Sequence, residues 1–409
     1  MSGSTGAAKG SINAFLETGL EGKKSTTKEQ AHLIALSTPG SGLSRELLKA
    51  QGGFLWWYAD LVDEKGDGLV IIWSFGLPFL PGYASAARQD KAPEAGLRPS
   101  LNVSTYKEGK LDFYLLQEFE PQDVEWQALE EGDRWVFGKS RLESLMTDQG
   151  RRLWIELHLD VPGMPGEEIK ITLQAQGAGA FETSGEHRPS ERLSDPLPEH
   201  DWTPVLCATK GEAVLEFPQS RQELRGRLYH DRNGGIKPLH DLGIDIWVWG
   251  RVALQDRDFI YYVLDGQDGS QKALFLEIDT QGKMVEVKDA ELRRGPRKRN
   301  FGGLRYWPSM EIWRGGELYL QLHHDDVVDS GPFYMRTVFQ ALDGEGKAHR
   351  GIAEICDPER VDLAIHRPLV KMRVHFRERP SSMWLPLFTG PRSGRVSRLL
   401  RSWIPGRIE

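Results

Sequence analysis

Cysteine, long apolar runs and an excess of positive charge are scarce or missing in this sequence of 409 residues. Its two cysteines, Cys207 and Cys356, are too few for a disulfide framework and indicate a reducing compartment. Residues 1–10 contain no apolar stretch of the kind that secretory signals carry, and no run approaches the roughly 18 apolar residues of a membrane-spanning helix. The formal net charge of −7 excludes a nucleic-acid-binding surface over the whole chain. These absences predict a cytoplasmic protein without nucleic-acid partners.

Motifs of several enzyme classes are absent as well. The sequence has no phosphate-cradling G-x-x-x-x-G-K-[ST] motif, no dinucleotide fingerprint after a strand and no G-x-S-x-G nucleophile elbow. The best candidate for a metal site is His323-His324-Asp325-Asp326. Adjacent residues of a strand point to opposite faces, so these two histidines cannot bind one metal ion without a bend. The sequence therefore predicts no metal site.

Aromatic and β-branched residues fill short runs from residue 54 onward, and these runs are separated by Gly, Pro and Asp turns. The chain has 13 Trp residues, which supply aromatic surface for a core or a ligand cavity. Residues 105–116, TYKEGKLDFYLL, alternate on both sides of Glu108-Gly109 and predict a β-hairpin. Helices are expected only near residues 43–50, LSRELLKA, and at the C-terminus. This rhythm predicts a mainly β fold of antiparallel barrels or sandwiches.

A polar, Pro-rich stretch at residues 183–204 separates two segments that both consist of short strand-like runs divided by turns. We therefore expect two β-rich domains that divide near residue 215. The expected organisation is a mobile N-terminus with a short helix at 1–50, β domains at 51–215 and 216–388, and a basic amphipathic helix at 389–409.

In two short segments, a side chain that can donate or accept a proton stands near an aromatic side chain. In GRLYHDRNGG, the strand pattern puts Tyr229 and Asp231 on one face, and Asn233-Gly234-Gly235 is typical of a turn. In EHDWTP, His200 and Trp202 stand two residues apart. Asp231 has two interpretations: a backbone acceptor that caps the turn, or a carboxylic acid at the strand end that faces an apolar cavity.

Four segments together resemble one known family: FLWWYADLVDEKGDGLVIIWSFGLPFLPGYASA, PSLNVSTYKEGK, GRLYHDRNGGIKPL and IDIWVWGRV. They are similar to the carotenoid 1,2-hydratases (hydroxyneurosporene synthases) and their lipocalin-like relatives, which include fungal Diels–Alderases. The resemblance covers about residues 50–380 and implies two lipocalin-like β domains with the site between or within them. By position it implies that Asp231 is the acid, and that Tyr229, His200 and Trp202 shape and polarise the site.

The activity that the resemblance implies is addition of water to a terminal alkene of a carotenoid or related terpenoid. Protonation of such an alkene gives a tertiary carbocation that water captures, so no metal or redox cofactor is required. The acid must be protonated near neutral pH, so Asp231 is expected to be desolvated with a raised pKa. The faces of Trp202 and Tyr229 are expected to stabilise the cation. The Trp-rich strands supply the expected substrate contacts, Trp56, Trp57, Tyr58, Trp247, Trp249 and Arg251.

Other functions remain open on the same scaffold. One alternative is a pericyclase or a proton-initiated terpenoid cyclase. Another is a non-catalytic, lipocalin-like binder of hydrophobic ligands in which Asp231 only caps a turn.

The C-terminal segment RSGRVSRLLRSWIPGRIE interleaves arginines with apolar residues. A basic amphipathic helix of this kind is typical of a segment that lies on an anionic bilayer. A surface helix that caps the barrel would show the same pattern. Because a polyene substrate resides in membrane, the first interpretation predicts peripheral contact with the inner face of the membrane.

Overall fold

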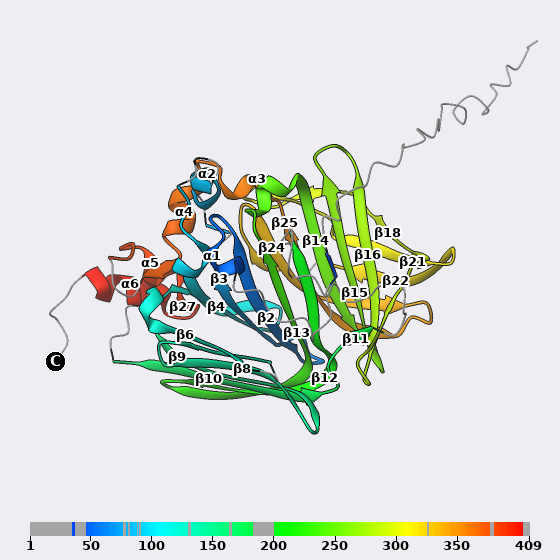
Figure 1. The fold of residues 1–409 in the computed structure, drawn as a ribbon, viewed down its shortest axis with the longest axis horizontal. Coiled ribbons are helices and arrows are strands. Elements are labelled where there is room, and N and C mark those ends of the chain that lie inside the picture. The colour runs from blue at the N-terminus through cyan, green and yellow to red at the C-terminus, as the bar shows by residue number, and fades with distance from the viewer. Residues whose placement is uncertain are drawn as a thin grey trace, which may run out of the picture. The chain divides into compact units, whose positions relative to one another are not determined.

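A computed structural model describes two large β-sheets within the compact unit Leu33–Glu409 (Figure 1). The residues that it describes are 35–36, 46–76, 79–80, 82–87, 89, 91–129, 132–162, 166–182, 200–324, 327–376 and 380–403.

The first sheet is built mainly from antiparallel neighbours. Its strands follow in the order β26 (Val374–Phe376), β5 (Lys110–Glu118), β4 (Pro99–Lys107), β3 (Gly68–Phe75), β2 (Phe54–Val62), β13 (Ser220–Gly235), β12 (Asp201–Phe217), β10 (Glu168–Gly177), β9 (Gly150–Asp160), β8 (Ser140–Thr147), β7 (Gly132–Phe137) and β6 (Val124–Leu129). Two short strands join at the side: β1 (Ala35–Leu36) pairs with β12, and β27 (Gly390–Pro391) pairs with β5.

The second sheet is again mostly antiparallel. Its order is β11 (Phe181–Glu182), β17 (Lys283–Glu286), β16 (Gln271–Asp279), β15 (Arg257–Gly266), β14 (Ile244–Ala253), β25 (Ala348–Cys356), β24 (Tyr334–Asp343), β22 (Glu317–His323), β21 (Ser309–Arg314) and β18 (Ala290–Arg294). Strand β23 (Val327–Ser330) pairs with β24, and β19 (Lys298–Arg299) with β20 (Arg305–Tyr306) forms a separate ribbon.

Helices are short. They are α1 (Glu46–Lys49), α2 (Tyr83–Ala87), α3 (Pro358–Val361), α4 (Arg367–Lys371), α5 (Leu385–Phe388) and α6 (Arg395–Trp403), with 3-10 turns η1 (Ala95–Leu97), η2 (Pro121–Asp123) and η3 (Leu239–Leu242). The sequence predicted helix only where α1 and α6 lie. The others span at most five residues, which is too short to produce a helical period, and α3, α4 and α5 each have a proline at their first or second residue.

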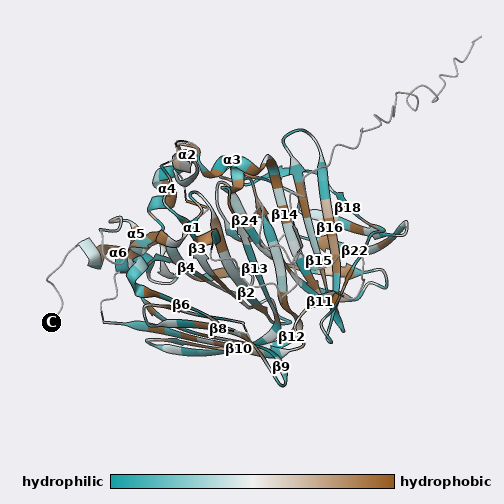
Figure 2. Ribbon diagram, viewed as in Figure 1, coloured by the Kyte–Doolittle hydropathy of each residue, from teal (hydrophilic) through white to brown (hydrophobic). Residues whose placement is uncertain are grey.

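Strand β2 lies between two apolar layers, which explains why all nine of its residues are buried. Its residues Leu55, Trp57 and Ala59 pack into the core of the first sheet. Residues Trp56 and Tyr58 point the other way, into a second core that also includes side chains of β13, β14, β15 and β25. Figure 2 shows hydrophobic and hydrophilic segments alternating along the strands of both sheets. The candidate site lies in this second, inter-sheet layer.

The predicted fold class is confirmed: the structure is mainly β, with two curled, lipocalin-like sheets and few helices. The hairpin at 105–116 is also confirmed, since β4 and β5 flank Glu108 and Gly109, both with positive φ. The predicted turn at Asn233-Gly234-Gly235 is wrong, because β13 continues to Gly235 and pairs there with β2. The first sheet contains all of β12 and β13, and the division into domains near residue 215 stays a prediction. Residues 183–199 of the predicted linker lie outside the described residues.

Candidate active site

Asp231 is buried in the inter-sheet layer and accepts two hydrogen bonds on one oxygen. Trp202 Nε1 and Tyr229 Oη each donate to Asp231 Oδ2 at 2.8 Å. The arrangement follows from strand pairing: Tyr229 and Asp231 lie two apart on β13, and Trp202 lies on the neighbouring β12. The three side chains are at most 3 % exposed. The same-face prediction for Tyr229 and Asp231 is therefore confirmed.

Asn233 connects this carboxyl group to His200. Its Nδ2 donates to Asp231 Oδ1 at 3.1 Å, and its Oδ1 lies 3.1 Å from His200 Nε2. Tyr262 Oη, from β15 of the second sheet, lies 3.2 Å from the same His200 nitrogen. The structure thus brings His200 near Asp231 through Asn233 rather than by direct contact. The period-two pattern of 229, 231 and 233 could have indicated Asn233, which the sequence analysis assigned to a turn.

Burial sets the protonation states of this group. Desolvation raises the pKa of Asp231 to about 8, against the opposing effect of the hydrogen bonds from Trp202 and Tyr229. Desolvation also lowers the pKa of His200 to about 4. At neutral pH Asp231 is therefore a carboxylic acid beside a neutral imidazole. Because both strong donors point at Oδ2, Oδ1 is the oxygen left to carry the acidic proton.

A cavity of about 400 Å³ opens in front of Asp231. Two rows of side chains face each other across it. The row from the first sheet contains Asp231, Tyr58, Ile72, Asn102 and Leu116, which are successive partners across β13, β2, β3, β4 and β5. The row from the second sheet contains Tyr262, Trp249, Glu354 and Arg336, which are successive partners across β15, β14, β25 and β24.

Four of the predicted substrate contacts line this cavity: Trp56, Tyr58, Trp247 and Trp249. Their rings pack across the two sheets, with centroids 6.0 Å apart for Trp56 and Trp247 and 5.3 Å apart for Tyr58 and Trp249. Trp202 and Tyr229 are not among the lining residues and lie behind Asp231. The ring faces that the cavity presents are therefore those of the lining residues and not those of Trp202 and Tyr229.

Two other predicted contacts lie elsewhere. Trp57 points into the core of the first sheet and packs edge-to-face against Trp135, because neighbours of Trp56 on a strand must face the opposite side. Arg251 forms a buried ion pair with Asp60, with Nε 3.0 and 3.1 Å from its two carboxylate oxygens. Neither residue of this pair lines the cavity, and Arg251 lines a larger polar cleft instead. Neither Trp57 nor Arg251 is positioned to contact a ligand in the cavity.

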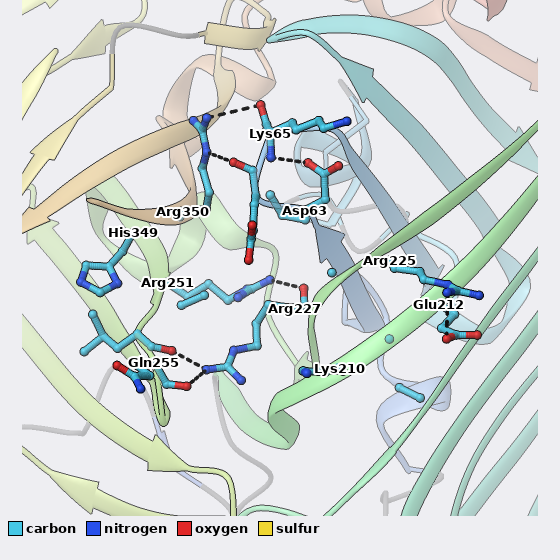
Figure 3. A pocket seen from close by; sticks show the side chains of 18 of the residues that line it. Asp63, Lys65, Lys210, Glu212, Arg225, Arg227, Arg251, Gln255, His349 and Arg350 are labelled. Carbon is cyan, nitrogen blue, oxygen red and sulfur yellow. Dashed lines mark hydrogen bonds and ion pairs between the residues drawn. The ribbon is translucent and has the colours of Figure 1, made fainter. Parts of the chain in front are cut away.

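A larger and more polar cleft of about 1490 Å³ lies near the other end of β13 (Figure 3). Its arginines are engaged with the protein itself. Arg227 donates to the carbonyls of Ala208 and Gln255 at 3.0 and 3.3 Å, and Arg350 donates to the carbonyl of Glu64 at 2.9 Å. No acid there is enclosed by aromatic rings, so the smaller cavity is the stronger candidate for proton transfer to an alkene.

The structure describes only part of the candidate metal site at residues 323–326. His324 is fully buried, with Nε2 3.3 Å from Tyr261 Oη, whereas His323 ends β22; Asp325 and Asp326 lie outside the described residues. No three His, Cys, Asp or Glu side chains within the described ranges are grouped so that they could hold a metal ion.

Sequence reasoning missed Arg336 and Glu354, both of which line the cavity. Arg336 is 1 % exposed and donates from Nε to Glu354 Oε1 at 2.8 Å. The sequence did contain one indication: Glu354 stands inside the apolar strand segment GIAEIC. A charged residue in such a segment needs a partner of opposite charge. That partner sits on a different strand, and only the sheet register identifies it.

The C-terminal segment contributes to the same cavity. Leu369 of α4, Phe388 of α5 and Arg392 line it, and Leu369 is also 47 % exposed, so the cavity reaches the surface there. Helix α6 packs inward through Leu399 and Arg398, whose Nη1 donates to the Ser393 carbonyl at 2.7 Å. No helix in the part of the chain that the structure describes is both long and apolar enough to span a bilayer.

Comparisons with known proteins identify relatives of this chain. It is 27% identical over 387 residues to the hydroxyneurosporene dehydrogenase of Chlorobaculum tepidum, covering 87% of this chain and 96% of that protein. It is 28% identical over 357 residues to the acyclic carotenoid 1,2-hydratase of Thiocapsa roseopersicina, covering 83% and 76%. The crystal structure of an AttH candidate protein from Nitrosomonas europaea has the same fold, with a TM-score of 0.54 at 14% identity, and covers 77% of this chain and 94% of that one. The profile of the carotenoid hydratase CrtC matches residues 71–382, and the chain belongs to this family.

Proposed function

We propose that this protein adds water to a terminal trisubstituted alkene of an acyclic carotenoid or a related terpenoid, without a cofactor and through a tertiary carbocation. The observation that carries this proposal is a neutral carboxylic acid, Asp231, at the wall of an aromatic cavity. Its hydrogen-bond partners Trp202, Tyr229 and Asn233 are all uncharged. The hydratase named among its relatives supports the same reaction class.

The first step transfers a proton from Asp231 Oδ1 to the less substituted carbon of the alkene. As Oδ1 loses its proton, negative charge spreads over the carboxylate, and the donors Trp202 and Tyr229 on Oδ2 stabilise that charge. They act as positioning residues, since they hold the carboxyl group without lining the cavity. The rings of Trp56, Trp247 and Trp249 face the cavity, and each can stabilise a cation by about 0.5–2 kcal/mol.

The cavity suits one end of a polyene. Its volume of about 400 Å³ is near the lower end of the range for small-molecule sites, roughly 300–1,000 Å³. A long acyclic substrate can place its terminal alkene beside Asp231 and extend through the opening at Leu369. The aromatic rings of the lining nearest Asp231 shield its carboxyl group from the bulk water that would otherwise ionise it.

Isotope labelling tests this function against the alternatives. Incubation with an acyclic carotenoid in D2O and in H2¹⁸O should give a tertiary alcohol with one ¹⁸O atom and one deuterium on the adjacent carbon. A proton-initiated cyclase would incorporate deuterium but no oxygen, a pericyclase would incorporate neither, and a binder would return the carotenoid unchanged. Any of these three results would replace hydration as the function.

We also propose that the cavity opening rests on an anionic bilayer at the cytoplasmic face. The outer face of α6 exposes apolar Val396 and Leu400, at 57 % and 50 %, beside Arg395 and Arg401. Trp403 adds an aromatic side chain that is 41 % exposed. Apolar groups between cations are the pattern of an interfacial helix, and this helix follows the segment that lines the cavity. The two free, buried thiols of the described chain support a reducing compartment.

Substituting Val396→Ser and Leu400→Ser together should weaken binding to vesicles that contain anionic lipid by about tenfold or more, because two apolar side chains leave the interface. Vesicle co-sedimentation measures this, and added salt should weaken binding by the wild-type chain as well. The matched control is Leu318→Ser on β22. This leucine is also exposed, at 38 %, but it belongs to the second sheet and not to α6. If the α6 variant and the wild type bind vesicles equally, α6 only caps the barrel and does not contact the bilayer.

A further inference from the structure

A second carboxylate, Glu354, faces the cavity from the sheet opposite Asp231. Asp231 belongs to β13 of the first sheet and Glu354 to β25 of the second, and both line the cavity. Trp249 lies between them: it is the β14 partner of Glu354, and its ring centroid lies 5.4 Å from that of Tyr229, which donates to Asp231. The two carboxyl groups therefore occupy opposite walls of one aromatic chamber.

The surroundings of the two groups differ in charge. Asp231 has only neutral donors around it, which favours its protonated form. Glu354 is instead paired with the buried guanidinium of Arg336. Arg336 Nε and Nη2 both lie 2.8 Å from Oε1, so Oε2 is the oxygen to which a water molecule entering the cavity can donate. One carboxyl group among neutral donors and a second one paired with an arginine, both facing the same cavity, form an arrangement typical of an acid and base pair.

Arg336 is itself held firmly. Its Nη1 donates to Tyr106 Oη at 2.6 Å, and its guanidinium carbon lies 5.4 Å from the ring centroid of Tyr334. Because the arginine is fixed on three sides, it fixes the direction of the Glu354 carboxylate. The groups that interact electrostatically with Glu354 are Arg336 and Tyr334 from β24, Tyr58 from β2, Asp231 from β13, Tyr262 from β15 and Cys356 from its own strand.

We propose that Glu354, oriented by Arg336, is the base that takes a proton from the attacking water. This inference rests on the proposed hydration. The carbocation formed by Asp231 is attacked by a lone pair of the water oxygen, which makes the C–O bond. One O–H bond of that water breaks, and its proton passes to Glu354 Oε2. Glu354 then releases a proton, Asp231 regains one from water, and the net change is alkene plus water to tertiary alcohol.

Two other groups are weaker candidates for this base. Asp329 also lines the cavity, but it lies 3.6 Å from Arg373 and acts on the pKa values of Tyr106 and Tyr114, on β4 and β5. His200 does not line the cavity, and its Nε2 is occupied by Asn233 and Tyr262. Glu354 alone among the three faces the cavity and interacts with Asp231.

The test is Glu354→Gln assayed in D2O with an acyclic carotenoid. Alcohol formation should fall by about 100-fold or more, the usual scale for a base. The recovered alkene should nevertheless gain deuterium, because Asp231 still protonates it and the uncaptured cation loses a proton again. Asp231→Asn should give neither alcohol nor deuterium exchange, and Glu291→Gln, which changes a carboxylate paired with Arg293 on β18 outside the cavity lining, should form alcohol as the wild type does. Loss of exchange in folded Glu354→Gln, or full alcohol formation, would overturn the assignment.

A second variant covers the case in which Glu354→Gln does not fold. Glu354→Ala leaves space beside the Arg336 guanidinium, so added formate should restore alcohol formation in a concentration-dependent way. Alcohol formation that formate leaves unchanged would overturn the base role. Failure of the proposed function looks different: the wild-type enzyme itself would then form no ¹⁸O-labelled alcohol.

Discussion

Asp231→Asn is expected to lower alcohol formation by about 100-fold or more while the cavity and its ligand binding persist. Asparagine has nearly the same shape, and its carbonyl oxygen can accept the hydrogen bonds that Trp202 and Tyr229 give to Oδ2. It lacks an acidic proton, so the alkene cannot be protonated. Carotenoid turnover and tryptophan fluorescence quenching by the carotenoid measure the two properties separately.

The pH profile provides the second measurement on the same residue. Burial raises the pKa of Asp231 to about 8, so the active, protonated form predominates below that pH and disappears as the pH rises through it. Wild-type kcat/KM should therefore be level near neutral pH and decline above about pH 8. Any residual activity of Asp231→Asn should lack this decline.

The control for this prediction is Asp329→Asn, which changes another carboxylate in the same cavity that already pairs with Arg373. It should retain the alkaline decline and most of the activity. Near wild-type turnover by Asp231→Asn would contradict the acid role and favour a pericyclase, which depends on shape and hydrogen bonds.

Local periodicity predicted part of the site correctly. Because side chains on a strand alternate, Tyr229 and Asp231 had to share a face, and they do. The same rule should have separated Trp56 from Trp57. Both looked like contact residues because β2 is buried on both faces, so composition could not distinguish the cavity side from the core side.

Tertiary packing overrode the turn signal in Asn233-Gly234-Gly235. Strand β13 is paired on both sides, with β12 and with β2, so its backbone continues extended through this stretch. Gly234 serves close packing instead of a turn, since a Cβ there would lie 2.8 Å from Leu55 Cδ1. The Glu354–Arg336 pair depends on sheet register between β24 and β25, which no local pattern in the sequence specifies.

The partner of Arg251, like that of Glu354, lies on another strand and could not be predicted from a local pattern. Substitution of Arg251 should have a large effect on stability. Arg251→Met is expected to lower the free energy of unfolding by about 3–5 kcal/mol, because it leaves Asp60 as a buried charge without a partner. Arg251 and Asp60 are 1 % and 0 % exposed, and Arg251 also donates from Nη2 to the Arg227 carbonyl at 3.0 Å. Denaturant unfolding of the purified variant measures the loss.

The double variant Asp60→Asn with Arg251→Met separates an ion pair from a substrate contact. Removing both charges together should restore most of the lost stability, since neither partner is then left charged in the interior. Arg251 Nη1 also lies 3.9 Å from Asp258, so part of the loss should remain in the double variant. A substrate contact would behave in the opposite way: Arg251→Met would raise KM for the carotenoid with little change in unfolding, and Asp60→Asn would rescue nothing. The buried position of both side chains, away from the cavity lining, favours the first result.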